Sequence, residues 1–283
     1  MIDKRTSPIM ISGMHRSGTS MLTGVLNDLG LIIGNILDSN KESIFFQRIN
    51  IWMMSLLGAS WDSPKQFEDI NDDLRDNVVE QIKQLLSSRT NSLYFGWSSI
   101  IKKKSFNELS NPWGWKDPRN TFTGTIWNEV FPNLKAIYII RHPIDVAESL
   151  MRRQKVEIGK DLDREKKYSD IVKALMSVHH TNYNSSMLIK SYSDCFSLID
   201  TYYSQILANK VDNSIIFKFE VIISKPEVVL ERILNFSEIS YKTKALNLVS
   251  DNMKKDRSYA YRKDRRLVEF ESLNEDLIIK MGY

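Results

Sequence analysis

Residues 13–20 (GMHRSGTS) constrain the fold of this chain more than any other segment. Two glycines bracket four residues, a short apolar run at 9–11 comes before them, and an amphipathic helix follows and ends at Gly30. Backbone N–H groups in such a loop and at a helix N-terminus point at an anion, and glycine lets that anion approach closely. The segment therefore predicts a phosphate-type site between a buried strand and a helix.

The cation of this loop does not stand where a nucleotide triphosphatase has it. In that class a lysine follows the second glycine and reaches the β- and γ-phosphates. Here Thr19 follows Gly18, and the charged residue is Arg16, inside the loop. The spacing favours an anion-binding loop that lacks the lysine. The alternative is an ordinary glycine-containing turn between a strand and a helix.

Two more strand–loop–helix units follow along the chain. Residues 136–140 (AIYII) have the pattern of a buried strand, and Pro143 stands where the next helix begins. Residues 215–219 (IIFKF) predict another strand, and an amphipathic helix follows from Pro226. Three such units indicate an α/β protein. We therefore predict a P-loop-like three-layer fold with a central, mainly parallel sheet flanked by helices.

Composition narrows the expected partners and compartment. The chain has 39 basic and 35 acidic residues, a net charge of +4, which suits a small polyanion and is low for a nucleic-acid-binding protein. A single cysteine, Cys195, and no apolar run of membrane-spanning length favour a cytoplasmic protein without a membrane span. The four histidines lack zinc spacing, so no metal is expected. With no linker or repeat, residues 1–283 are expected to form a single domain with a helical insertion at about 155–208.

The loop at 13–20 resembles the 5′-phosphosulfate-binding loop of sulfotransferases that use PAPS (3′-phosphoadenosine-5′-phosphosulfate). Residues 141–149 (RHPIDVAES) follow the AIYII strand and resemble the family's 3′-phosphate motif, which Arg141 and Ser149 match residue for residue. A guanidinium presents a fork of donors that suits a phosphate, and Arg153, one helical turn after Ser149, is expected to add a second cation. The resemblance implies PAPS as co-substrate and PAP as product, held by Gly13, His15, Arg16, Ser17, Gly18, Thr19, Ser20, Arg141, Ser149 and Arg153.

Residues 113–119 (WGWKDPR) are similar to the KDP segment of tyrosylprotein sulfotransferases and of many bacterial sulfotransferases, where the lysine lies at the transferring sulfuryl group. The resemblance implies that Lys116, together with Arg16, stabilises charge during transfer. For the tryptophans of this segment a structural turn is the commoner role. Glu42 matches approximately the glutamate base of the tyrosylprotein enzymes and is the candidate base here. The alternative for Glu42 is a solvated or helix-capping carboxylate.

The sequence departs from the family in three places. Cytosolic members have a tryptophan for the adenine just after the loop, where this chain has Met21, and their catalytic-histidine motif is absent. Many relatives have a Tyr-Glu pair after the late strand, where this chain has Phe219 and Glu220. The group that stacks on the adenine is therefore unassigned, and Tyr259 or Tyr261 of the basic segment 254–266 is the candidate.

The hydroxyl acceptor is left open as a small molecule, a glycan, a lipid or a peptide. Six aromatic residues are candidates for its pocket, although aromatic residues at helical spacing belong more often to the core: Phe45, Phe46, Trp52, Trp61, Trp97 and Trp113. Two other functions remain open. One is a P-loop nucleotide kinase-like phosphotransferase, weakened by the missing lysine. The other is a nucleic-acid-binding module that uses residues 254–266, weakened by the small net charge.

Overall fold

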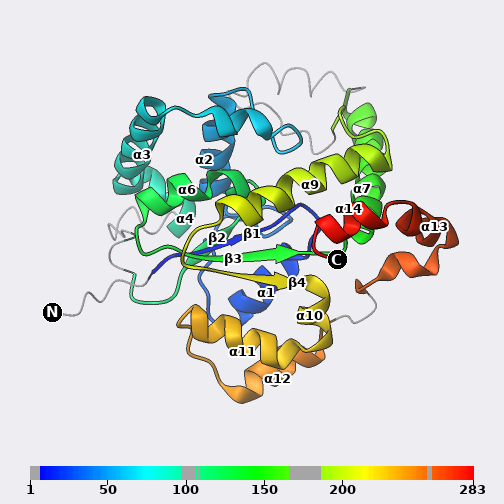
Figure 1. The fold of residues 1–283 in the computed structure, drawn as a ribbon. Helices are drawn as coiled ribbons and strands as arrows, with labels where there is room; N and C mark the ends of the chain where they lie inside the picture. The colour runs from blue at the N-terminus through cyan, green and yellow to red at the C-terminus, as the bar shows by residue number, and fades with distance from the viewer. Residues whose placement is uncertain (1–6, 97–105, 107–108, 166–185, 254–256) are drawn as a thin grey trace.

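A parallel sheet organises the chain. The computed structural model describes residues 7–96, 106, 109–165, 186–253 and 257–283. In these residues four parallel strands pair in the order β2-β1-β3-β4 (Figure 1). The strands are β1 (Ile9–Ser12), β2 (Gly114–Lys116), β3 (Lys135–Ile140) and β4 (Ser214–Lys218).

Three of the four strands were predicted, and the fourth is a correction. The apolar runs became β1, β3 and β4, but β4 ends one residue earlier than predicted because Phe219 begins the next helix. Residues 114–116, expected to be part of a turn, instead form the edge strand β2. Gly114 allows this pairing, because a Cβ atom there would lie 1.9 Å from the carbonyl oxygen of Ile9.

Helices cover both faces of the sheet, so the predicted three-layer α/β fold is confirmed (Figure 1). The helix α1 follows β1 directly, α7 follows β3, and α10 follows β4, as the repeated strand–loop–helix units require. The α-helices are α1 (Thr19–Asp28), α2 (Ile44–Ser55), α3 (Asp72–Ser87), α4 (Ser92–Phe95), α6 (Asn120–Val130), α7 (Pro143–Glu165), α9 (Tyr192–Asn209), α10 (Phe219–Ser224), α11 (Pro226–Phe236), α12 (Thr243–Asp251), α13 (Arg265–Leu273) and α14 (Glu275–Lys280).

The two faces of the sheet have separate hydrophobic cores. Successive strand side chains point to opposite faces. Ile9 and Ile11 of β1 therefore pack in one core with residues of α1, α10, α11 and α12. Met10 of β1 and Tyr138 of β3 pack in the other core, with residues of α2, α3, α6, α7 and α9.

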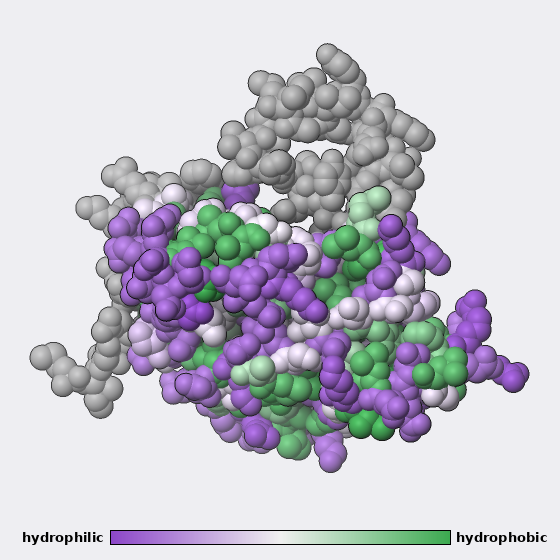
Figure 2. Space-filling model, turned by 45° about the horizontal axis from the view of Figure 1, so that its top comes forward, coloured by the Kyte–Doolittle hydropathy of each residue, from purple (hydrophilic) through white to green (hydrophobic). Residues whose placement is uncertain are grey.

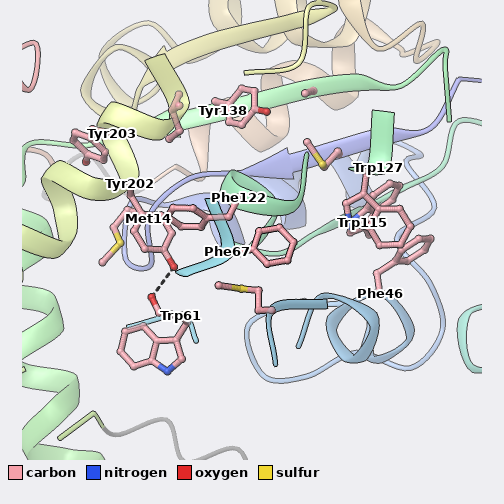
Figure 3. Close-up of a cluster of buried hydrophobic side chains, with 14 of the residues drawn as sticks. Met14, Phe46, Trp61, Phe67, Trp115, Phe122, Trp127, Tyr138, Tyr202 and Tyr203 are labelled. Atoms are coloured by element: carbon pink, nitrogen blue, oxygen red, sulfur yellow. Dashed lines mark hydrogen bonds between the residues drawn. The ribbon is translucent and has the colours of Figure 1, made fainter. Parts of the chain in front are cut away.

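Most of the aromatic residues considered for an acceptor pocket belong to the second core. The Phe46 ring stacks on Trp115 with centroids 4.1 Å apart and an interplanar angle of 8°, and Trp127 packs edge-on against both (Figure 3). Phe45, Trp61 and Trp113 are also buried. Trp52 is half-buried at the edge of this core, and Trp97 lies outside the described residues.

The predicted insertion at about 155–208 is helical in part, and residues 186–191 within it form no helix. Residues 155–165 continue α7, residues 192–208 belong to α9, and residues 166–185 lie outside the described part. Hydrophilic side chains cover much of the face in Figure 2, with smaller apolar groups between them. No helix in the described ranges is both long and apolar enough to cross a membrane.

Candidate active site

A cavity of about 520 Å³ opens at the carboxyl ends of the strands. The loop after β1, the end of β2 and the end of β3 all reach it, as expected for an open parallel sheet. Predicted site residues from these segments and from the chain before α2 and along α7 share its wall: His15, Arg16, Gly18, Thr19, Ser20, Glu42, Lys116, Arg141, Ser149 and Arg153.

Gly13 and Ser17 shape the loop without lining the cavity. Gly13 has a φ of 146°, and a Cβ atom there would lie 2.2 Å from the carbonyl oxygen of Ile139. The hydroxyl of Ser17 is buried and donates to the carbonyl oxygen of Met14 at 2.6 Å. Gly18 has a φ of 98° and lies against the Phe219 ring. The loop is therefore fixed from the inside, while Arg16 projects from it with a φ of 71°.

A hydrogen bond joins the two segments that resemble phosphate motifs. Arg16 Nε donates to Ser149 Oγ at 2.9 Å, although 133 positions separate them in the sequence. Arg141 donates in turn to the carbonyl oxygen of Arg16 at 3.2 Å. The pKa of Arg16 is lowered by burial and by the neighbouring guanidinium groups of Arg141 and Arg257. Three like charges gathered in one place favour a ligand with several negative charges.

The guanidinium of Arg141 is held in place from several sides. Asp145, one turn along α7, pairs with it at 3.2 Å, and the carbonyl oxygen of Arg257 accepts a further hydrogen bond. The guanidinium carbon of Arg141 lies 4.6 Å from the centroid of the Phe219 ring. The Nε atom is buried and has no hydrogen-bond partner among the described residues. A preorganised guanidinium with an unused donor is suited to bind an oxyanion.

Glu42 and Lys116 form a buried ion pair at the cavity. Lys116 Nζ lies 2.8 Å from Glu42 Oε1, Arg119 lies 3.7 Å from the other oxygen, and Gln47 donates to that oxygen at 2.8 Å. Burial opposes ionisation of Glu42, but the charges of Lys116 and Arg119 outweigh it and hold the pKa of Glu42 below its ordinary value. Glu42 is thus neither solvated nor a helix cap; it is an ionised carboxylate inside the site.

A polar network behind the cavity positions this ion pair. Asn50 of α2 donates to Asp117 at 3.0 Å and to Asn120 at 2.8 Å, and Trp127 donates to the Asn50 oxygen. Burial raises the pKa of Asp117 to about 6, although Arg119 beside it opposes the change. The network ties α2 to the start of α6 and so places Lys116 at the end of β2.

Part of the cavity wall is apolar and could not be identified from the sequence. Met21 and Val25 of α1, Ile223 of α10, Val249 of α12 and Met253 after it line the cavity and belong to one hydrophobic core. In the sequence, these residues belong to ordinary amphipathic helix patterns. They come together because α10 and α12 pack in the same core as α1. Arg257 and Asn252 also line the cavity and were not singled out before. The sequence signal that could have identified Arg257 is the basic character of residues 254–266.

Neither tyrosine considered for the adenine lies at this cavity, which corrects that expectation. Tyr261 is buried, its ring stacks on His142 with centroids 4.7 Å apart, and its backbone N–H donates to Asp145. Tyr259 lies 5.5 Å from the His142 ring, under the guanidinium of Arg262. Both are held on the far side of Arg141 because Asp145 and the C-terminal helices bind that segment.

Comparisons with known proteins point to one family. Residues 8–243 match the model of a sulfotransferase family. None of the curated proteins matches the sequence.

Several solved structures are similar in three dimensions at low sequence identity. The sulfotransferase domain from the curacin biosynthetic pathway is 15% identical over 89% of this chain and 80% of its own, with a TM-score of 0.47. The sulfotransferase domain from the Synechococcus PCC 7002 olefin synthase is 17% identical over 90% and 81%, with a TM-score of 0.45. Mouse sulfotransferase SULT7A1, solved in complex with PAP, is 12% identical over 93% and 70%, with a TM-score of 0.38.

Proposed function

Because this chain belongs to the sulfotransferase family, we propose that it transfers a sulfuryl group from PAPS to a hydroxyl acceptor at the cavity described above. The main support is the hydrogen bond from Arg16 to Ser149, which joins the loop at 13–20 to the 141–149 segment at one cavity. Lys116 and Glu42 share that cavity. The unused Nε donor of Arg141 fits the 3′-phosphate that distinguishes PAPS from other adenylates.

We propose that the loop at 13–20 binds the 5′-phosphosulfate and that Arg141 and Ser149 bind the 3′-phosphate. Thr19 and Ser20 lie at the start of α1, where hydroxyl and backbone donors face an anion. Met21, Ile223 and Met253 offer an apolar surface for the adenine in place of the family's tryptophan.

Transfer then requires positive charge at the sulfate oxygens and a base at the acceptor. Arg16, Lys116 and the loop N–H groups supply the charge without a metal ion. Glu42 takes the proton of the acceptor hydroxyl while the acceptor oxygen bonds to sulfur. At the same time the bond from sulfur to the 5′-phosphate oxygen breaks, and PAP leaves with that oxygen. When Lys116 turns its N–H donors to the sulfuryl oxygens, its hold on Glu42 weakens and the carboxylate becomes more basic.

Binding of PAP separates this function from a nucleotide kinase. PAP without Mg²⁺ is expected to raise the melting temperature, while AMP and ATP·Mg²⁺ raise it much less. Transfer from PAPS is expected to survive EDTA. Loss of transfer on chelation, restored by Mg²⁺, would instead support the kinase-like function.

The Arg141→Ala variant tests the 3′-phosphate site directly. Truncation removes a charge-assisted contact and is expected to weaken PAP binding by about 2–4 kcal/mol, measured by calorimetry. Arg265→Ala is the matched control, because Arg265 lies on α13 and its side chain is 93% exposed. Equal affinity of the parent protein for PAP and AMP would contradict the proposal.

A further inference from the structure

Arg153 lines the cavity at a place apart from the Arg141 group. Its guanidinium carbon lies 4.7 Å from the centroid of the Trp61 ring. The His15 ring meets the same tryptophan edge-on, with centroids 4.8 Å apart. The hydroxyl of Tyr202 donates a hydrogen bond to the backbone carbonyl oxygen of Trp61 at 2.8 Å and so helps to fix Trp61 (Figure 3). Arg141, in contrast, packs on Phe219 and pairs with Asp145.

Arg153 and His15 both have unused hydrogen-bonding atoms. Arg153 Nε and His15 Nε2 are buried, and neither has a hydrogen-bond partner in the described part of the chain. Burial and the charge of Arg16 lower the pKa of Arg153 to about 10, and burial with the charge of Arg153 lowers that of His15 well below its ordinary value. The carboxylates of Glu157 and Glu42 oppose this lowering of the Arg153 pKa, and Glu42 is paired with Lys116. A buried guanidinium of this kind favours an anionic partner from outside the chain.

The position of these two side chains relative to Glu42 suggests which molecule supplies that anion. Glu42, Lys116, His15 and Arg153 all line this cavity, and the charges of both Lys116 and Arg153 act on His15. An acceptor whose hydroxyl approaches Glu42 brings its neighbouring substituents toward Arg153. Arg141, Ser149 and Phe219 lie on the side proposed for the 3′-phosphate.

We propose that the acceptor has an anionic oxygen group (a carboxylate, sulfate or phosphate) near the hydroxyl that is sulfated, and that Arg153 and His15 bind this group. The inference rests on the proposed function and deepens it by naming the acceptor class. From the sequence, Arg153 was expected to bind PAPS, whereas this inference assigns it to the binding of the hydroxyl acceptor. Trp61 stacks under Arg153 and keeps the guanidinium extended toward the ligand.

Matched probes, each with a hydroxyl group, test the charge preference by calorimetry, with the protein both free and saturated with PAP. The pairs are 4-hydroxyphenylacetate with its amide, glucose 6-phosphate with glucose, and glucose 6-sulfate with glucose. A charged member is expected to bind at least tenfold more tightly than its neutral counterpart, since a hydrogen bond to a charged group contributes that much. The preference is expected to disappear in Arg153→Met, whose apolar side chain keeps the packing on Trp61, and to persist in part in Arg153→Lys.

Arg152→Met is the control, because Arg152 precedes Arg153 on α7 but is 72% exposed and pairs with Glu148. PAP affinity is expected to stay within about threefold of the parent in Arg153→Met. Equal binding of charged and neutral probes, no binding of any probe, or a preference that survives Arg153→Met would overturn the inference. So would a loss of PAP affinity as large as that of Arg141→Ala, which would return Arg153 to the donor site. Failure of the parent to bind PAP would instead count against the proposed function, and titrations of the free protein would still report on Arg153.

Discussion

Glu42 and Lys116 are almost excluded from water, with side chains 4% and 2% exposed. A buried carboxylate is expensive unless it is paired, so each of these residues depends on the other for its charge. The same pairing limits the basicity of Glu42 until Lys116 finds another acceptor. In the proposed mechanism, the proton acceptor and the group that stabilises the sulfuryl oxygens therefore act together.

Glu42→Gln tests the base. Glutamine keeps the size and the hydrogen bonds but removes the basicity, so kcat is expected to fall by roughly 10²–10⁴ while PAP affinity hardly changes. A phenol of low pKa should lose less rate than an alkyl alcohol, because it needs less help to ionise. Steady-state kinetics with both acceptor types measure this difference.

Glu148→Gln is the control for this experiment. Glu148 lies on α7, pairs with Arg152 at 2.8 Å and accepts a hydrogen bond from Tyr192. Its substitution is expected to leave kcat within a few-fold of the parent. If Glu42→Gln turns over an alkyl alcohol at nearly the parent rate, the base lies elsewhere.

At the scale of elements, the packing of α10 against the loop at 13–20 connects the two proposed phosphate positions. A Cβ atom on Gly18 would lie 2.3 Å from Phe219 Cδ2, the ring beneath Arg141. Gly18→Ala is expected to displace this ring and weaken PAP binding at least tenfold, because the φ of 98° is also strained for alanine.

The Gly30→Ala variant separates the effect of backbone strain from the effect of displacing the Phe219 ring. Gly30 has a similar φ of 110°, but a Cβ atom there meets nothing within 4 Å. This variant is expected to lose stability by about 1–2 kcal/mol and to keep the PAP affinity of the parent. Calorimetry for PAP and denaturant unfolding measure the two effects. Equal PAP affinity in both variants would show that the Phe219 contact does not matter.

The strands that could be predicted are those whose sequence pattern lies within one short stretch of residues. The runs at 9–11 and 136–140 are apolar because both faces of a parallel sheet are covered, and that pattern is visible in one short window. β2 has three residues, two of them glycine and lysine, and only its pairing with β1 makes it a strand. The motif residues were identified by their resemblance to the motifs of a known family. Val249 and Met253 reach the cavity through helix packing that no spacing encodes.

At the scale of the whole molecule, His142 links the sheet to the C-terminal helices. Its backbone N–H donates to Glu220 at 2.9 Å, and the hydroxyl of Tyr283 donates to the other oxygen of that carboxylate at 2.9 Å. The ring lies between Tyr261 and Tyr283. This arrangement joins the start of α7, the start of α10 and Tyr283, three residues after the end of α14.

Acid is expected to loosen this junction. Burial lowers the pKa of His142 to about 4, although Asp145 opposes the shift. An unfolded histidine titrates near 6.5, so between about pH 6.5 and 4 the unfolded chain binds more protons and stability falls as the pH decreases. His142→Gln is expected to remove about 2 kcal/mol of this pH dependence, measured as the difference in unfolding free energy between parent and variant from pH 7 to 4. A constant difference across that range would contradict the assignment.

The two hydrophobic cores on opposite faces of the sheet give this protein two routes of divergence. The apolar wall that would receive the adenine belongs to the layer of α1, α10 and α12, whereas Trp61 and the ring cluster around Phe46 belong to the other layer. Substitutions far apart that share no contacts act nearly independently. Substitutions in one layer can therefore change the cavity wall on that side, while the wall formed by the other layer is inherited unchanged.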